Sequence, residues 1–170
     1  MKVRRLGIGL EISLKGYKLA LDPPKGYKGF SLFSGTFPIK EKSGEGSYGP
    51  FQWEVIELKA LRGKINAFLI RVEGLKLLYA GGALELPDDQ YQALALASGG
   101  TWYMDPLRAC RAFKTSPAKA FLPTALWRPG ISLPLEGLEE VRDRCRGLRR
   151  VRARVAELKI PEERTVFLLE

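Results

Sequence analysis

Hydrophobic and polar residues alternate along the first half of the chain with the two-residue period of a β-strand. One predicted strand face carries Leu6, Ile8, Leu10, Ile12 and Leu14. The segments between such runs are rich in glycine, proline and aspartate, which favour turns. The strands expected in this half are 6–14, 17–21, 29–34, 51–61, 65–72 and 75–80.

The second half of the chain shows signals for helices between short apolar segments. Asp88 and Asp105 are typical N-cap residues, and Pro106 stands at a first helical position. We therefore expect helices over 88–98, 106–114 and 136–146, strands over 101–104 and 119–122, and a closing hairpin of 151–158 with 165–169. No linker divides the chain, so the sequence predicts one α/β domain spanning residues 1–170, with helices outside two packed sheets.

Four local sequences resemble conserved segments of the metallo-β-lactamase-like superfamily. GLEISLKGYKLALDPP is similar to the family's opening hairpin, which ends in an aspartate, here Asp22. KGFSLFSGTFPIK resembles the strand and loop that normally carry Ser-His-x-His-x-Asp-His. The hairpin before the family's Tyr-x-Gly-Asp metal loop is resembled by KINAFLIRVEGLKLLYAGG. The strand before the family's last metal-binding histidine is resembled by KAFLPTALW. The resemblance implies an αββα sandwich, reduced in size.

The positions that bind metal in that family hold other residues in this chain. We name them the vestigial metal-site positions: Gly35, Phe37, Ile39, Lys40, Gly82 and Ala125. None offers a carboxylate, imidazole or thiolate, which are the usual ligands of divalent metals. We therefore expect no metal and no other cofactor. The family's hydrolysis, which uses a metal-bound hydroxide, is not expected either.

Composition narrows the possible chemistry further. The 170 residues include no histidine, which excludes histidine-based triads and imidazole ligands. Cys110 and Cys145 are expected to be free and buried, with a bridge between them as the lesser alternative. The many charged residues are typical of thermophilic proteins. No apolar run approaches the length of a membrane span and no signal peptide is recognised, so a cytoplasmic protein is expected.

Arginine is the strongest positive signal, within a net charge of +9. Alternation in the predicted strand places Arg150, Arg152 and Arg154 on one face, about 7 Å apart, which is close to phosphate spacing. The alternative is an ordinary surface whose arginines pair with acidic side chains. A second anion site could form where Lys40 and Arg62 meet at the vestigial cleft. The candidate anion-binding or nucleic-acid-binding residues are Lys40, Arg62, Arg146, Arg149, Arg150, Arg152 and Arg154.

These observations predict a non-catalytic binding protein whose partner is nucleic acid or another protein. Two alternatives stay open: an enzyme that acts without metal at the vestigial cleft, and a structural subunit of an active homologue. A binding protein and an enzyme differ in the kind of site that we expect. An enzyme would show converging polar groups in a pocket, whereas a binding module would show an open basic or apolar surface.

Overall fold

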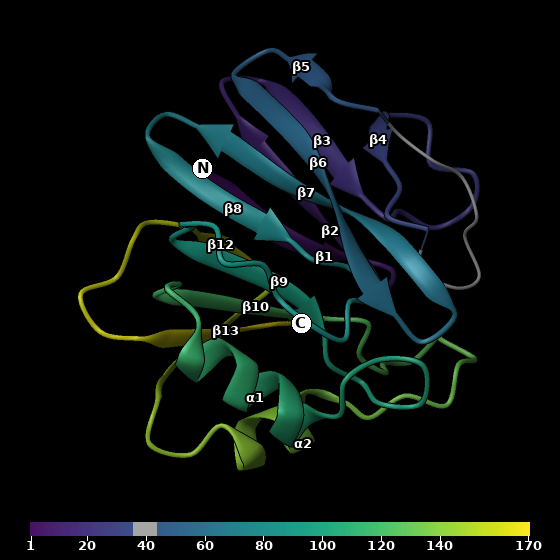
Figure 1. Ribbon diagram of the computed structural model, residues 1–170, viewed down its shortest axis with the longest axis vertical. Coiled ribbons are helices and arrows are strands. Elements are labelled where there is room, and N and C mark those ends of the chain that lie inside the picture. The colour runs from purple at the N-terminus through teal and green to yellow at the C-terminus, as the bar shows by residue number, and fades with distance from the viewer. Residues whose placement is uncertain (36–43) are drawn as a thin grey trace.

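Two β-sheets packed face to face form the body of the protein in this computed structural model, which describes residues 1–35 and 44–170 (Figure 1). The first sheet has the strand order β12-β1-β2-β3-β4. Its strands are β1 (Lys2–Leu6), β2 (Gly9–Leu14), β3 (Tyr17–Leu21), β4 (Phe30–Leu32) and β12 (Val155–Glu157).

The second sheet has the strand order β11-β13-β10-β9-β8-β7-β6-β5 and mixes parallel with antiparallel pairs. Its strands are β5 (Gly46–Tyr48), β6 (Phe51–Ala60), β7 (Gly63–Val72), β8 (Leu75–Tyr79), β9 (Ala93–Ala97), β10 (Ala120–Thr124), β11 (Arg149–Ala153) and β13 (Thr165–Leu169). The segment 51–80, in which hydrophobic and polar residues alternate, thus forms the predicted strands, and these pair antiparallel.

The two larger hydrophobic cores of the described residues follow from this layering. Alternate residues of both sheets, such as Ile12, Leu19, Phe68 and Leu77, fill the space between the sheets. A second core lies on the other face of the eight-stranded sheet, beneath the helices α1 (Pro106–Thr115) and α2 (Leu138–Arg144). Figure 1 shows both helices on this one side, and no helix covers the five-stranded sheet in the described part of the chain. The observed layers are therefore β, β and α, with one helical layer of the expected αββα arrangement.

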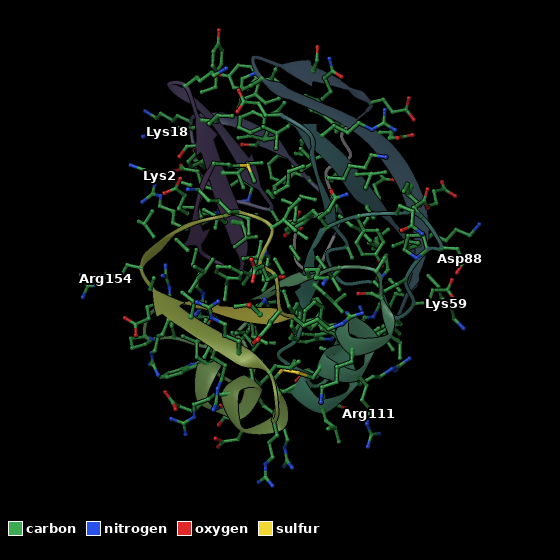
Figure 2. All side chains as sticks on the ribbon, turned by 90° about the vertical axis from the view of Figure 1, so that its left-hand side faces the viewer. Lys2, Lys18, Lys59, Asp88, Arg111 and Arg154 are labelled. Carbon is green, nitrogen blue, oxygen red and sulfur yellow. A yellow bond between two sulfur atoms is a disulfide. The ribbon has the colours of Figure 1, made fainter. Side chains whose placement is uncertain are left out.

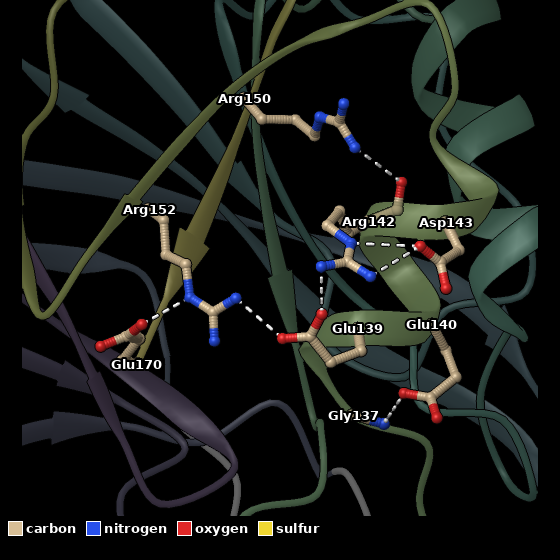
Figure 3. A network of polar contacts seen from close by, with 8 residues as sticks. All are labelled: Gly137, Glu139, Glu140, Arg142, Asp143, Arg150, Arg152 and Glu170. Atoms are coloured by element: carbon tan, nitrogen blue, oxygen red, sulfur yellow. Dashed lines mark hydrogen bonds and ion pairs between the residues drawn. The ribbon is translucent and has the colours of Figure 1, made fainter.

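Local sequence explains where the helices begin. The Asp105 carboxylate accepts a hydrogen bond of 2.9 Å from the Arg108 backbone N–H, and Pro106 opens α1 as predicted. In α2 the Glu140 carboxylate reaches back to the Gly137 N–H at 3.0 Å (Figure 3). The second helix is shorter than the predicted 136–146, and none of the helices described in the chain is long and apolar enough to cross a membrane.

The predicted helix over 88–98 is wrong, because its apolar part forms the central strand β9. All five residues of Ala93–Ala97 are buried, and the strand pairs in parallel with both β8 and β10. A strand covered on both faces is continuously apolar, so it lacks the alternation that marks a half-exposed strand. The predicted strand over 101–104 is wrong as well: this segment is a turn in which Thr101 has a φ of 63°.

Two strand predictions at the chain ends are also corrected. Residues 6–14 form no single strand, because the chain turns at Gly7, with a φ of 59°, between β1 and β2. The closing hairpin is wrong: β11 runs parallel to β13, while β12 leaves for the other sheet and pairs with β1. The predicted segment 151–158 is therefore divided between the two sheets.

The sequence predicted that Cys110 and Cys145 are free, which is wrong. The two cysteines form a disulfide with a Cα–Cα distance of 5.5 Å. Cys110 lies on α1 and Cys145 directly follows α2. Both cysteines are buried in the second core. The bond therefore ties the two helices to one another beneath the eight-stranded sheet.

Candidate functional site: a strand-end edge and an arginine surface

Several strands of both sheets end at one edge of the sandwich, and the loops that follow them lie together there. The Ala97 N–H donates to the Gly81 carbonyl at 3.0 Å, and the Ser98 N–H donates to the Thr124 carbonyl at 2.9 Å. Gly81 also lies against Ser34, since a Cβ added to Gly81 would fall 2.6 Å from the Ser34 Oγ. These contacts join the segments after β4, β8, β9 and β10, and we call this region the strand-end edge.

A buried polar cluster around Asp22 holds the strand-end edge together. The Asp22 carboxylate accepts hydrogen bonds from the Ser34 N–H at 2.8 Å, the Ser34 hydroxyl at 2.5 Å and the Tyr79 hydroxyl at 2.9 Å. Asp22 follows β3 and Tyr79 ends β8, so the cluster connects the two sheets. Asp22 itself has a positive φ of 49°, which aspartate tolerates better than most residues.

The tyrosines of this region are held in their neutral form. Burial raises the pKa of Tyr79 well above its usual value, and the adjacent Asp22 charge acts in the same direction. Burial likewise raises the pKa of Tyr103, again with Asp22 contributing. A neutral phenol keeps its proton, so Tyr79 acts as a hydrogen-bond donor to Asp22 rather than as a base.

The strand-end edge includes three of the vestigial metal-site positions. Gly35 follows Ser34, Gly82 follows Gly81, and Ala125 directly follows β10. Ala125 also donates its N–H to the Ile8 carbonyl at 2.8 Å, which fixes the β1–β2 turn against this loop. Phe37, Ile39 and Lys40 lie outside the described residues. Arg62 is exposed in the turn between β6 and β7, and its predicted meeting with Lys40 is not tested.

The described side chains do not fit a divalent metal at this edge. Glycine and alanine offer no donor side chain at positions 35, 82 and 125. The Asp22 carboxylate is engaged by Ser34 and Tyr79, and residues 1–35 and 44–170 contain no group of three potential acidic, cysteine or histidine ligands. Nothing in these residues supports a metal-bound hydroxide at this site.

The predicted arginine stripe has a different geometry from a simple row. Arg152 is bound by two acidic residues, because its guanidinium donates to Glu139 on α2 and to Glu170 at the C-terminus (Figure 3). Arg142 pairs with Glu139 at 2.6 Å and with Asp143 at 3.0 Å. The pKa of Glu139 is lowered, first of all by the hydrogen bond from Arg152. Arg152 is therefore part of an ion-pair network between helix and strand.

The other arginines of this region keep their charge uncompensated. They are exposed and form no ion pair with an acidic side chain within the described chain: Arg144, Arg146, Arg149, Arg150 and Arg154. The Arg150 guanidinium donates to the Arg142 backbone carbonyl at 3.3 Å, which places it over the end of α2 (Figure 3). Figure 2 shows Arg154 projecting away from the body of the protein. We call these five residues the open arginine surface, which wraps around the edge strand β11 because Arg149 and Arg150 lie on its opposite faces.

Sequence reasoning found some of these features and missed others. Asp22 was recognised as the aspartate of the opening hairpin, but its partners Ser34 and Tyr79 are brought to it only by the fold. The acids that bind Arg152 come from α2 and from the last residue of the chain. No sequence signal marks Arg5 as a buried residue, because it sits in a charged segment next to Arg4.

Several solved structures superpose on this chain over most of its length. A putative Zn-dependent hydrolase of the metallo-β-lactamase superfamily from Thermotoga maritima superposes with a TM-score of 0.73 at 17% identity, covering 99% of this chain and 97% of that one. YhfI from Bacillus subtilis, a metallo-β-lactamase fold protein, gives a TM-score of 0.63 at 12% identity and covers 98% and 95%. Igni18, a metallo hydrolase from Ignicoccus hospitalis, gives 0.56 at 13% identity and covers 85% and 89%.

The chain therefore has the metallo-β-lactamase fold, and the predicted resemblance is confirmed at the level of the fold. No family model matches the sequence, and no curated protein sequence is similar to it. The hydrolase descriptions belong to the neighbouring structures, whose identity to this chain is too low to carry their activity over.

Proposed function

We propose that this protein is a non-catalytic binding module of the metallo-β-lactamase fold, and that the open arginine surface binds nucleic acid. The observation that carries the proposal is the group of five exposed arginines around α2 and β11, which have no acidic partner in the part of the chain that the structure describes. A cation that is already paired with a carboxylate gains little from a phosphate, whereas an unpaired guanidinium can form bidentate phosphate contacts.

Further positive charge lies beside this surface. The Lys114 ammonium of α1 donates to the Arg146 carbonyl at 3.2 Å, so the end of α1 adjoins the arginines. Because this arrangement offers cations to phosphates, binding should depend little on nucleotide sequence.

The test is a titration of the full chain with fluorescently labelled single-stranded and double-stranded oligonucleotides at several salt concentrations. The triple variant Arg149→Gln, Arg150→Gln, Arg154→Gln removes three open arginines. Each lost phosphate contact should reduce the slope of log K against log salt by about 0.7 to 0.9, so the triple variant should lose about 2 to 3 in slope.

A matched control separates this surface from net charge. Lys2, Lys18 and Lys59 are exposed on other elements and are labelled in Figure 2. Changing all three to Gln removes the same charge, yet should leave most of the affinity and of the slope. Arg152→Gln should also bind nearly normally, because its guanidinium is engaged by Glu139 and Glu170.

Two outcomes would overturn the proposal. One is the absence of salt-sensitive binding by the wild-type chain at low ionic strength, which would favour a protein partner instead. The other is an equal loss in the arginine and lysine triple variants, since that would show unspecific attraction by the net charge of +9.

A further inference from the structure

Arg5 is a buried cation without an acidic partner among the described residues. Only 9% of the residue is exposed, and its Nη2 atom is buried with no hydrogen-bond acceptor. Its Nε donates to the Gly7 carbonyl at 3.3 Å, which is a weak contact. No ion pair of Arg5 occurs within residues 1–35 and 44–170. A buried charge normally has a counter-charge, because removing an ion from water costs several kcal/mol.

The strand register places Arg5 in the space between the two sheets, close to the strand-end edge. Arg5 pairs with Leu10, Leu10 pairs with Leu21, and Leu21 pairs with Leu32 along the five-stranded sheet. These three leucines belong to the core between the sheets. Arg5 thus lies at the end of this core, at a position where the neighbouring strands carry leucine.

A second arginine approaches the same place from the other sheet. The hydrogen bond from the Ala125 N–H to the Ile8 carbonyl fixes the β1–β2 turn against the loop after β10. Arg5 lies three residues before Ile8, and Arg128 lies three residues after Ala125. Arg128 is partly exposed, and its positive charge acts on Arg5.

Arg5 keeps its proton despite its burial. Burial, and in second place the charge of Arg128, lowers the pKa of Arg5 to about 10. The guanidinium therefore stays positive at neutral pH. The positive charge of Arg128 thus acts on a guanidinium that has an unsatisfied donor, an arrangement that an anion would complete.

We propose that Arg5 and Arg128 form a binding site for a small oxyanion group, a phosphate or a carboxylate, at the strand-end edge. Such a group offers two or more acceptor oxygens, which can satisfy Arg5 Nη2 and bridge to Arg128 in the paired geometry that guanidinium groups favour. Arg5, largely removed from water, binds more strongly than a surface arginine does. The site uses β1 and the loop after β10 and is independent of the open arginine surface.

The probe is inorganic phosphate at low millimolar concentration, added at constant ionic strength with chloride as the reference anion. Calorimetric titration should show one site in the wild-type chain. At ten times Kd, the unfolding midpoint should rise by about 3 to 6 °C. Arg5→Met should abolish both signals. Arg128→Gln should weaken binding at least about tenfold, because one of the two charged contacts is lost.

Arg111→Gln is the matched control, since it removes an exposed arginine of α1 and should retain phosphate binding. A general effect of phosphate on protein stability would shift all four proteins equally, and that result would overturn the proposal. Absence of binding heat in the wild type would overturn it as well. Should Arg5→Met fail to fold, the comparison of Arg128→Gln with Arg111→Gln still decides.

A parallel titration with malonate identifies the source of the oxyanion. Tighter binding of malonate indicates a carboxylate ligand, whereas tighter binding of phosphate indicates a phosphorylated one. The triple variant of Arg149, Arg150 and Arg154 should keep the phosphate signal even if it loses nucleic-acid binding. Failure of one proposal is thus distinguishable from failure of the other.

Discussion

The Tyr79 hydroxyl donates a hydrogen bond of 2.9 Å to the Asp22 carboxylate, and the two residues are 57 positions apart in sequence. Asp22 follows the third strand of one sheet, and Tyr79 ends a central strand of the other. The pair fastens the two sheets to one another at the strand-end edge. In this chain the buried aspartate has protein donors as its partners.

Asp22→Ala should lower the free energy of unfolding by about 3 to 5 kcal/mol, because it leaves the Ser34 and Tyr79 donors buried without their acceptor. Tyr79→Phe removes one donor only and should cost about 1 to 2 kcal/mol. Urea unfolding measures both values. A loss below about 1 kcal/mol for Asp22→Ala would contradict a structural role of this cluster.

Gly81→Ala should also destabilise the strand-end edge. The new Cβ would lie 2.6 Å from the Ser34 Oγ, and the backbone has a φ of 53°. Crowding and backbone strain together should cost about 1 to 3 kcal/mol. Gly44→Ala is the control, since a Cβ there meets nothing within 4 Å. Equal unfolding midpoints of the two variants would show that the loop after β8 adapts to a side chain.

The antiparallel strands of 51–80 and the parallel strands β10 and β13 could be predicted from the sequence, whereas the central parallel strand β9 could not. Strands β6, β7 and β8 alternate or end at clear turns, and the expected ranges match them closely. Strand β9 consists of alternating alanine and leucine, and both residue types favour helices. Its strand conformation comes from parallel pairing with β8 and β10, which local sequence does not encode.

The candidate sites show the same division. The absence of metal ligands at Gly82 and Ala125 could be seen in the sequence, because the identity of the residue decides it. The pairing of the arginines could not be seen in the sequence, because the partners of Arg152 come from positions 139 and 170. Alternation correctly placed Arg150 and Arg152 on one strand face, but Arg154 lies beyond the end of β11.

Removing the disulfide should destabilise the protein without changing its fold. Cys110 and Cys145 are 35 positions apart, and closing a loop of this length corresponds to about 3 to 4 kcal/mol of unfolded-state entropy. The double variant Cys110→Ala, Cys145→Ala should lose about that much stability in urea unfolding. Titration of two thiols per chain in the denatured, unreduced protein would show instead that the cysteines are free.

Glu11 should make part of the stability dependent on pH. The hydrogen bonds from Arg4, at 2.8 and 3.2 Å, lower the pKa of this carboxyl in the folded protein. Its contribution is present above the unfolded pKa and is lost as the pH falls through the folded pKa. Glu11→Gln should therefore cost about 1 to 2 kcal/mol at pH 7, and the difference from wild type should shrink at pH 3.

Arg4→Gln provides the check on Glu11, because it removes the same pair from the other side. Both single variants and the double variant should show the same reduced dependence of stability on pH between 3 and 7. An unchanged acid response in Arg4→Gln would mean that the Tyr27 hydroxyl, which donates to Glu11 at 3.0 Å, is sufficient to hold the carboxylate.

The protein should neither bind nor need a transition metal at the strand-end edge. A tightly bound zinc ion needs three or four convergent donors, and Gly35, Gly82 and Ala125 supply none from their side chains. Elemental analysis of protein purified without chelator should give less than about 0.1 metal per chain, since no such donor set is present. Prolonged treatment with a chelator should leave the unfolding midpoint unchanged, because a ligand that binds only the folded state would raise that midpoint. Zinc, iron or manganese in a one-to-one ratio, retained through dialysis and lost together with stability on chelation, would refute this prediction. It would also remove the basis for regarding the protein as a non-catalytic member of this fold.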